Sequence, residues 1–225
     1  MKIWITGCAR TGTTLLGRLF YGYEGVTVID PEIELEYFID ASGASTPHYS
    51  GKRSVGSIFS NDLSGSLIKD QSRLIQDNDV MVVNIIRDGR DVISLPKDGT
   101  VATPKRWVAS MKQARDLKYL ICYTVRYELL CEDPDGVQEA LGAHLGLGTL
   151  HRWSDYPAFV PESVFERVTA TGEPFPTRYG ARKIEPSTHR TDGHRANPLV
   201  MDCPNEFEYW LDAYESRTHG TAHGV

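Results

Sequence analysis

The sequence predicts an α/β fold of three layers, in which a central parallel β-sheet is flanked by helices. Two observations carry this prediction: short apolar strands alternate with helical segments, and a glycine-rich loop joins the first strand to the first helix. With 225 residues, 40% of them hydrophobic, the chain is long enough for one domain with its own core. We expect a core over residues 1–148, a less regular part over 149–217 and a disordered tail over 218–225.

The first third of the chain predicts a strand over residues 2–6, the glycine loop, and a helix over 13–21 in which apolar residues recur at helical spacing. A second strand over 26–30 leads into the acidic segment PEIELEYFID. Residues 41–66 are rich in Gly and Ser and predict a long loop. A helix is expected over 67–76.

The strongest predicted strand is VMVVNII at 80–86, a continuous apolar run typical of a strand buried on both faces. A helix over 104–117, a further buried strand over 119–127, a helix over 134–145 and a final amphipathic helix over 205–216 follow. Strands that alternate with helices favour a parallel sheet, and in such sheets ligands bind at the carboxyl ends of the strands.

Composition narrows the function classes. The net charge of −6 makes nucleic acid an unfavourable partner, although a local basic site is compatible with it. The four cysteines are scattered without metal-binding spacing, so neither a zinc site nor a disulfide framework is expected. The first strand begins at Lys2 and no apolar run approaches the ~20 residues of a spanning helix, so we expect a cytoplasmic protein without signal peptide or transmembrane segment.

The glycine loop, GCARTGTTLL, matches the phosphate-binding pattern GxxxxGK[ST] except that Thr13 stands at the lysine position. Its glycines allow backbone N–H groups to approach an anion, and the start of the next helix adds partial positive charge. Arg10 supplies a cation from within the loop. The loop therefore favours an anion other than a nucleoside triphosphate; the alternative is a turn that holds no ligand.

A second candidate site, IIRDGRDVIS, follows the strongest predicted strand. The guanidinium of Arg87 can present a planar fork to a phosphate, and the hydroxyl of Ser94 can join it from the following helix. The alternative is a set of surface ion pairs that involve Arg87, Asp88, Arg90 and Asp91.

Together these motifs resemble the PAPS-dependent sulfotransferase superfamily, a P-loop type of fold, and in particular its short bacterial or phage-like members. CARTGTTLL is similar to the family's loop for a 5′-phosphosulfate, and IIRDGRDVIS to its 3′-phosphate motif. WVASMKQARDL and TVRYELLCEDPDGVQEALGAHLGL resemble the segments that follow in the family. The resemblance covers roughly residues 1–148.

The resemblance implies a donor, 3′-phosphoadenosine 5′-phosphosulfate (PAPS), a product, adenosine 3′,5′-bisphosphate (PAP), and no metal. It implies a 5′-phosphosulfate site formed by Arg10, Thr11, Gly12, Thr13 and Thr14. Arg87 and Ser94 would hold the 3′-phosphate, although Ser94 follows one residue earlier than is usual. Tyr127 would lie near adenine. A late basic segment would close over the 3′-phosphate, with Arg182 and Lys183 as its candidate residues.

The implied reaction moves a sulfuryl group in line to an acceptor hydroxyl or amine, with Arg10 neutralising the leaving oxygen and a base taking the acceptor's proton. Glu32, in the setting DPE, is the preferred base, and Glu34 and His48 are the alternatives. Two other functions stay open: a P-loop kinase for a small molecule or nucleotide that uses ATP and magnesium, and a nucleotide-binding module without activity. The sequence does not distinguish small-molecule, carbohydrate, lipid and peptide acceptors, nor does it fix the oligomeric state.

Overall fold

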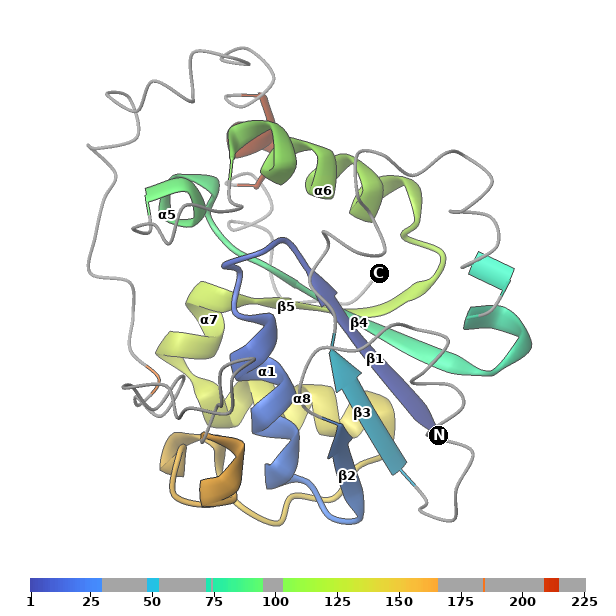
Figure 1. Cartoon of the computed structure of the whole chain (residues 1–225), viewed down its shortest axis with the longest axis vertical. Coiled ribbons are helices and arrows are strands. Elements are labelled where there is room, and N and C mark those ends of the chain that lie inside the picture. The colour runs from blue at the N-terminus through green and yellow to red at the C-terminus, as the bar shows by residue number, and fades with distance from the viewer. Residues whose placement is uncertain are drawn as a thin grey trace, which may run out of the picture.

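A computed structural model of the chain describes residues 1–29, 48–52, 72–73, 75–94, 103–165, 184 and 209–214. In this part of the chain a parallel sheet is covered by helices on both faces (Figure 1). The predicted α/β class with a central parallel sheet is confirmed.

The sheet has the strand order β2-β3-β1-β4-β5, and every neighbouring pair is parallel. Its strands are β1 (Lys2–Gly7), β2 (Val26–Ile29), β3 (His48–Lys52), β4 (Val80–Ile86) and β5 (Ile121–Arg126). β1 and β4 pair along almost their whole length, from Lys2↔Val80 to Gly7↔Ile85. These two strands form the centre of the fold.

β3 corrects the prediction of an uninterrupted loop over residues 41–66. It lies between β2 and β1, with Ile3 opposite Ser50 and Thr27 opposite Tyr49. Its sequence, HYSGK, has neither an apolar run nor clean alternation, so periodicity gives no sign of it. The strand is specified by main-chain pairing with two neighbours, which overrides local preference.

β5 differs from its prediction in burial. It was expected as a buried strand over 119–127, but it covers Ile121–Arg126, and of its residues only Val125 is buried. β5 stands last in the strand order and pairs with β4 alone, so its side chains are less covered than those of β4. The apolar content of YLICYTVRY overstated its burial.

The described α-helices lie on predicted ones, except the helix over residues 127–132, whose first residue was expected to end a strand. They are α1 (Thr13–Leu19), α5 (Gly89–Ser94), α6 (Pro104–Asp116), α7 (Tyr127–Glu132) and α8 (Pro134–Leu145), with the short 3-10 helices η1 (Phe20–Gly22), η2 (Trp153–Asp155) and η3 (Glu162–Val164). Residues 72–73 and 75–77 are helical, which overlaps the helix expected over 67–76 and extends one residue beyond it. Residues 209–214 are helical within the helix expected over 205–216, and we call them the C-terminal helix.

Helix ends form where capping rules place them. At the start of α6, the Thr103 hydroxyl accepts a hydrogen bond from the Arg106 N–H at 3.2 Å. At the start of α8, the Asp133 carboxylate accepts one from the Gly136 N–H at 2.9 Å. α8 ends at Gly146, whose φ of 67° is left-handed. These caps explain why α6 and α8 match their predicted bounds to within a residue.

The sheet separates two hydrophobic clusters. The larger one joins β1, β4 and β5 side chains such as Ile5 and Ile85 to α1, α7 and α8. The smaller one joins α5 and α6 to the C-terminal helix through Trp107, Trp210 and Tyr214. Figure 1 shows α6 and α5 on the side of the sheet away from α1 and α8. The C-terminal helix is thus part of a core layer.

Residues 149–165, for which the sequence showed no period, belong to the larger cluster. Trp153, Tyr156 and Phe165 are almost fully buried there. The side-chain amide of Gln138 fixes this segment by donating to the carbonyl of His151 at 2.8 Å, while its oxygen accepts from the Trp153 N–H at 3.0 Å. Aromatic burial, rather than a repeating pattern, holds the segment against α8.

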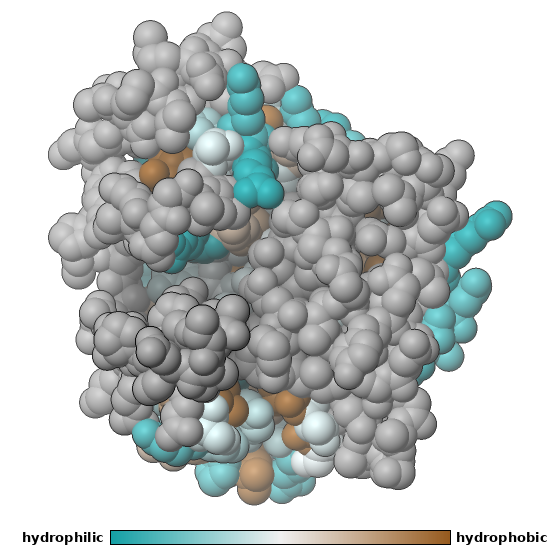
Figure 2. Space-filling model, in the orientation of Figure 1, coloured by the Kyte–Doolittle hydropathy of each residue, from teal (hydrophilic) through white to brown (hydrophobic). Residues whose placement is uncertain are grey.

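Figure 2 shows one face of the molecule, where hydrophobic and hydrophilic side chains of the described residues are mixed along the lower edge. Within the described ranges, no helix is long and apolar enough to cross a membrane.

Candidate functional site

The two motifs meet at the carboxyl edge of the sheet. Gly7, the last residue of β1, lies opposite Ile85 of β4, and Ile86 lies opposite Arg126 of β5. The glycine loop, the segment after β4 and the start of α7 therefore leave the sheet side by side. This is the edge at which open parallel sheets bind their ligands.

The glycine loop has a strained and tightly tied backbone. Arg10 has φ 72°, in the left-handed region that residues with a Cβ rarely adopt. Thr11 closes the turn, since its N–H and its hydroxyl donate to the Cys8 carbonyl at 3.1 Å and 2.6 Å. Both hydrogen-bond donors of Thr11 are thus directed at the Cys8 carbonyl.

Gly12 is required by two independent contacts. Its φ of 102° is left-handed, and a Cβ added to it would lie 2.8 Å from Cδ2 of Tyr127. The loop therefore lies directly against the tyrosine ring at the start of α7. This contact brings Tyr127 to the loop, and its place near adenine stays a prediction.

The start of α1 follows directly. Gly12 is the residue before the helix, no side chain caps the helix start, and the first turn holds no acidic residue. The first backbone N–H groups of a helix lack intrahelical partners. Thr13 is buried and Thr14 is half-buried at this end.

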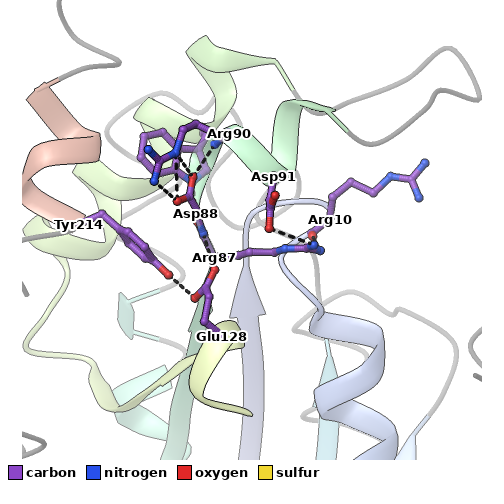
Figure 3. A network of polar contacts seen from close by, with 8 residues as sticks. Arg10, Arg87, Asp88, Arg90, Asp91, Glu128 and Tyr214 are labelled. Atoms are coloured by element: carbon purple, nitrogen blue, oxygen red, sulfur yellow. Dashed lines mark hydrogen bonds and ion pairs between the residues drawn. The ribbon is translucent and has the colours of Figure 1, made fainter. Parts of the chain in front are cut away.

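Arg87 connects the two motifs. It follows β4, its side chain is buried, and its Nη1 donates to the Arg10 carbonyl at 3.2 Å. Its guanidinium lies 4.1 Å from the centre of the Tyr127 ring, and its Nη2 is 3.5 Å from Oδ2 of Asp91. Its Nε is buried and has no hydrogen-bond partner among the described residues. Figure 3 shows this guanidinium against the loop, while the side chain of Arg10 extends away from it.

The surroundings of Arg87 and Asp88 are held by several elements. Trp107 of α6 donates from Nε1 to the Arg87 carbonyl at 3.1 Å. Oε1 of Glu128 in α7 accepts from the Asp88 N–H at 2.9 Å, and Oε2 accepts from the Tyr214 hydroxyl of the C-terminal helix. Ion pairing between Asp88 and Arg90 is confirmed, as the alternative reading of this motif expected.

Three of these residues, Trp107, Glu128 and Tyr214, were not predicted as site residues. Trp107 and Glu128 fall within the quoted family-like segments. The signal that could have found them is the need of Arg87 for residues that hold its backbone in place. Tyr214 carries no signal, because its partner is 86 residues away in sequence. Spatial proximity alone reveals it.

Burial raises the pKa of two groups here. The Tyr127 hydroxyl has its pKa raised to about 12, mainly by desolvation, and the Arg87 charge only partly opposes this. The buried thiol of Cys8, in the loop itself, also has its pKa raised to about 12 by desolvation, with Arg106 acting in the opposite direction. Both groups are neutral near pH 7.

The register of β3 does not bring His48, an alternative candidate base, to the glycine loop. It is the first residue of β3, opposite Val26, and the next residue, Tyr49, lies opposite Lys2 at the amino end of β1. Five residues separate the level of Lys2 from that of Gly7, which corresponds to about 17 Å along a strand. His48 therefore stands at the opposite edge of the sheet from the glycine loop.

Five other candidates lie wholly or partly outside what the structure describes. Glu32, with its alternative Glu34, and the basic residues Arg182 and Lys183 lie outside the described residues. Ser94 ends α5, but its side chain is also outside what the structure describes. Among the described residues, no group of three or more His, Cys, Asp and Glu side chains could hold a metal ion.

Comparison with known proteins supports the fold. No family model and no curated protein matches the sequence. Among solved structures, the chain is similar to the sulfotransferase domain of the olefin synthase from Synechococcus PCC 7002, with a TM-score of 0.54. The two share 17% sequence identity, and the match covers 93% of this chain and 94% of that one. The chain therefore has a sulfotransferase-like fold.

Proposed function

We propose that the protein is a sulfotransferase that moves a sulfuryl group from PAPS to an acceptor hydroxyl or amine. The observation that carries this proposal is the contact between a lysine-free phosphate loop and the buried guanidinium of Arg87, on a sulfotransferase-like fold. The donor has one phosphosulfate and one separate phosphate, which suits two anion sites at one sheet edge.

The charge balance supports an anionic ligand near Arg87. A buried cation is costly unless it is paired and hydrogen-bonded. Among the described residues, the Arg87 guanidinium contacts one carbonyl, one aromatic ring and one carboxylate at 3.5 Å, and its Nε has no hydrogen-bond partner there. A 3′-phosphate would supply the missing acceptor oxygens.

The loop supports the other end of the donor. Gly12 and the uncapped start of α1 offer main-chain N–H groups, and Arg10 adds a positive charge. Thr13 in place of the lysine disfavours a kinase, because that lysine reaches the β and γ phosphates of ATP. A phosphosulfate has no β and γ phosphates, so its binding does not require that lysine.

In the proposed reaction the acceptor oxygen or nitrogen forms a bond to sulfur as the bond from sulfur to the bridging phosphate oxygen breaks. The electron pair stays on that oxygen, and PAP leaves. Arg10 neutralises the charge that develops there, while a carboxylate takes the acceptor's proton. We assign this base to Glu32, with Glu34 as the alternative.

Ligand binding tests the donor. Titration calorimetry with PAP, and with ATP in the presence and absence of magnesium, should give binding of PAP without a metal requirement. A ligand at one hundred times its Kd should stabilise the fold by about 2.7 kcal/mol, which a thermal melt detects. Stabilisation by ATP with magnesium but not by PAP would contradict the proposal and favour a kinase.

Transfer of labelled sulfate from PAPS to a panel of phenol, carbohydrate, lipid and peptide acceptors tests activity. Glu32→Gln should leave the affinity for PAP unchanged and lower turnover by about 10²–10⁴-fold, because only the proton acceptor is lost. Glu36→Gln, in the same acidic run, is the matched control. Wild-type turnover in Glu32→Gln would transfer the role to Glu34, whereas binding of PAP without any transfer would indicate a nucleotide-binding module.

A further inference from the structure

The peptide group between Arg87 and Asp88 is held at both of its polar ends. Its carbonyl oxygen accepts from Trp107 Nε1 at 3.1 Å, and its N–H donates to Glu128 Oε1 at 2.9 Å. The two partners come from α6 and α7, which lie on different faces of the sheet. Because this peptide follows the Cα of Arg87 directly, its orientation helps to set the direction of the Arg87 side chain.

Gly89 leaves little room for this segment to shift. A Cβ added at Gly89 would lie 2.8 Å from the ring of Trp107. The Asp88 carboxylate is engaged by Arg90, which donates to it from its backbone N–H at 2.8 Å and from its Nε at 2.9 Å. These contacts together restrain the backbone of residues 87–90.

Glu128 links this segment to the C-terminal helix. One carboxylate oxygen accepts from the Asp88 N–H, and the other accepts from the Tyr214 hydroxyl (Figure 3). Tyr214 is itself buried, with the guanidinium of Arg126 5.0 Å from its ring centre. Tyr214 therefore helps to hold the Glu128 carboxylate, which in turn holds the Asp88 N–H.

We propose that Glu128, held by Tyr214, is a positioning residue that orients Arg87 for the 3′-phosphate of the donor. This inference rests on the proposed function. It assigns the C-terminal helix a part in nucleotide recognition without any contact between that helix and the nucleotide.

A positioning role has a signature that a structural role lacks. Loss of stability would weaken all adenine nucleotides alike, whereas misdirection of Arg87 would weaken only those with a 3′-phosphate. The informative quantity is the ratio of the Kd for adenosine 5′-phosphate to the Kd for PAP, since these ligands differ in that one group.

The experiment measures both dissociation constants by titration calorimetry for wild type, Glu128→Ala, Glu128→Gln and Tyr214→Phe. Arg87→Ala serves as the reference for complete loss of 3′-phosphate recognition. Glu132→Gln is the matched control, because Glu132 lies one turn further along the same helix and is exposed.

We expect Glu128→Ala to lower the ratio by about tenfold, the effect of losing a hydrogen bond to a charged group. Tyr214→Phe and Glu128→Gln should lower it by a smaller factor, since each keeps an acceptor for the Asp88 N–H. These two variants also test the inference if Glu128→Ala does not fold. Glu132→Gln should leave the ratio unchanged.

Two outcomes would overturn the inference and leave the proposed function intact. In the first, Arg87→Ala abolishes the preference for PAP but all Glu128 and Tyr214 variants retain it. In the second, those variants weaken both ligands equally, which is a structural effect. Absence of any preference for PAP in the wild type would overturn the inference and the proposed function together.

Discussion

Arg10 combines a left-handed backbone conformation with a carbonyl that accepts from a buried guanidinium. The conformation costs a residue with a Cβ on the order of 1–2 kcal/mol, so the surrounding contacts must offset it. The contacts of Thr11 with Cys8 and of Arg87 with Arg10 contribute to holding it. The strained residue is thus also the residue through which the two motifs touch.

Gly12→Ala tests how closely the loop fits the Tyr127 ring. We expect a loss of about 2 kcal/mol or more in the free energy of unfolding, because the left-handed φ is strained and the new Cβ meets the ring. Chemical denaturation measures it.

Gly146→Ala is the control for Gly12→Ala, since Gly146 also has a left-handed φ but has nothing within 4 Å of an added Cβ. It should lose only about 1 kcal/mol. In a Tyr127→Ala background, the loss of unfolding free energy caused by Gly12→Ala should become smaller, whereas the loss caused by Gly146→Ala should not change. Equal losses for the two glycine variants in the wild-type background would contradict the packing argument.

The buried Cys8 thiol predicts a loss of stability at alkaline pH. Its pKa is raised from 9.0 to about 12, so the unfolded chain loses this proton above pH 9 while the folded chain keeps it. The contribution is complete below pH 9 and declines from pH 9 to 12. Between pH 8 and 10, the free energy of unfolding of wild type should fall by about 1 kcal/mol more than that of Cys8→Ala. Parallel declines, measured with urea at both pH values, would exclude this linkage.

At the scale of elements, register decides which residues share an edge. β3 pairs with β1 so that Tyr49 meets Lys2, and Lys52 is the β3 residue opposite Ile5. The start of β3 is therefore at the amino edge of the sheet. Although β3 has only five residues, its first residue lies near the amino edge of the sheet and its last lies closer to the carboxyl edge.

His48→Ala should leave PAP affinity and sulfate transfer within about twofold of wild type, because the register places this residue at the edge of the sheet opposite the glycine loop. Both quantities are measured as for Glu32→Gln, which provides the contrasting result. A loss of turnover with unchanged binding in His48→Ala would show that the register does not describe the active enzyme.

Predictability varied between elements for physical reasons. β4, α6 and α8 were predicted because a continuous apolar run, a Pro at the first helical position and a terminal Gly act locally. β3 depends on pairing with distant strands, and HYSGK contains no local signal. At the site, the glycine loop, Arg87 and Tyr127 were expected together and lie together, whereas Glu128 and Tyr214 depend on contacts across the sheet.

At the scale of the whole molecule, the C-terminal helix completes the smaller hydrophobic cluster. Trp210 and Leu211 are buried there with Trp107 and Val92, although more than a hundred residues separate the two pairs. The same helix carries Tyr214 to Glu128. The last described element thus closes a layer of the core and one side of the candidate site.

Trp210→Ala should lower the free energy of unfolding by about 3–5 kcal/mol, because it removes a buried aromatic side chain and leaves a cavity. Tyr209→Ala, at the neighbouring and 62% exposed residue, should change it by less than about 0.5 kcal/mol. Urea unfolding followed by circular dichroism measures both. Similar values for the two variants would show that the C-terminal helix does not pack as a core element.

The bond between Tyr214 and Glu128 also has a consequence for biosynthesis. A ribosome delivers the glycine loop, Arg87 and Glu128 before Tyr214, so for part of translation the nascent chain contains both donor motifs without the tyrosine that fixes Glu128. The β1–β4 pairing can form in that interval, since both strands have already emerged. If the protein binds the proposed donor, recognition of its 3′-phosphate should therefore mature late, after the chain has been synthesised past residue 214.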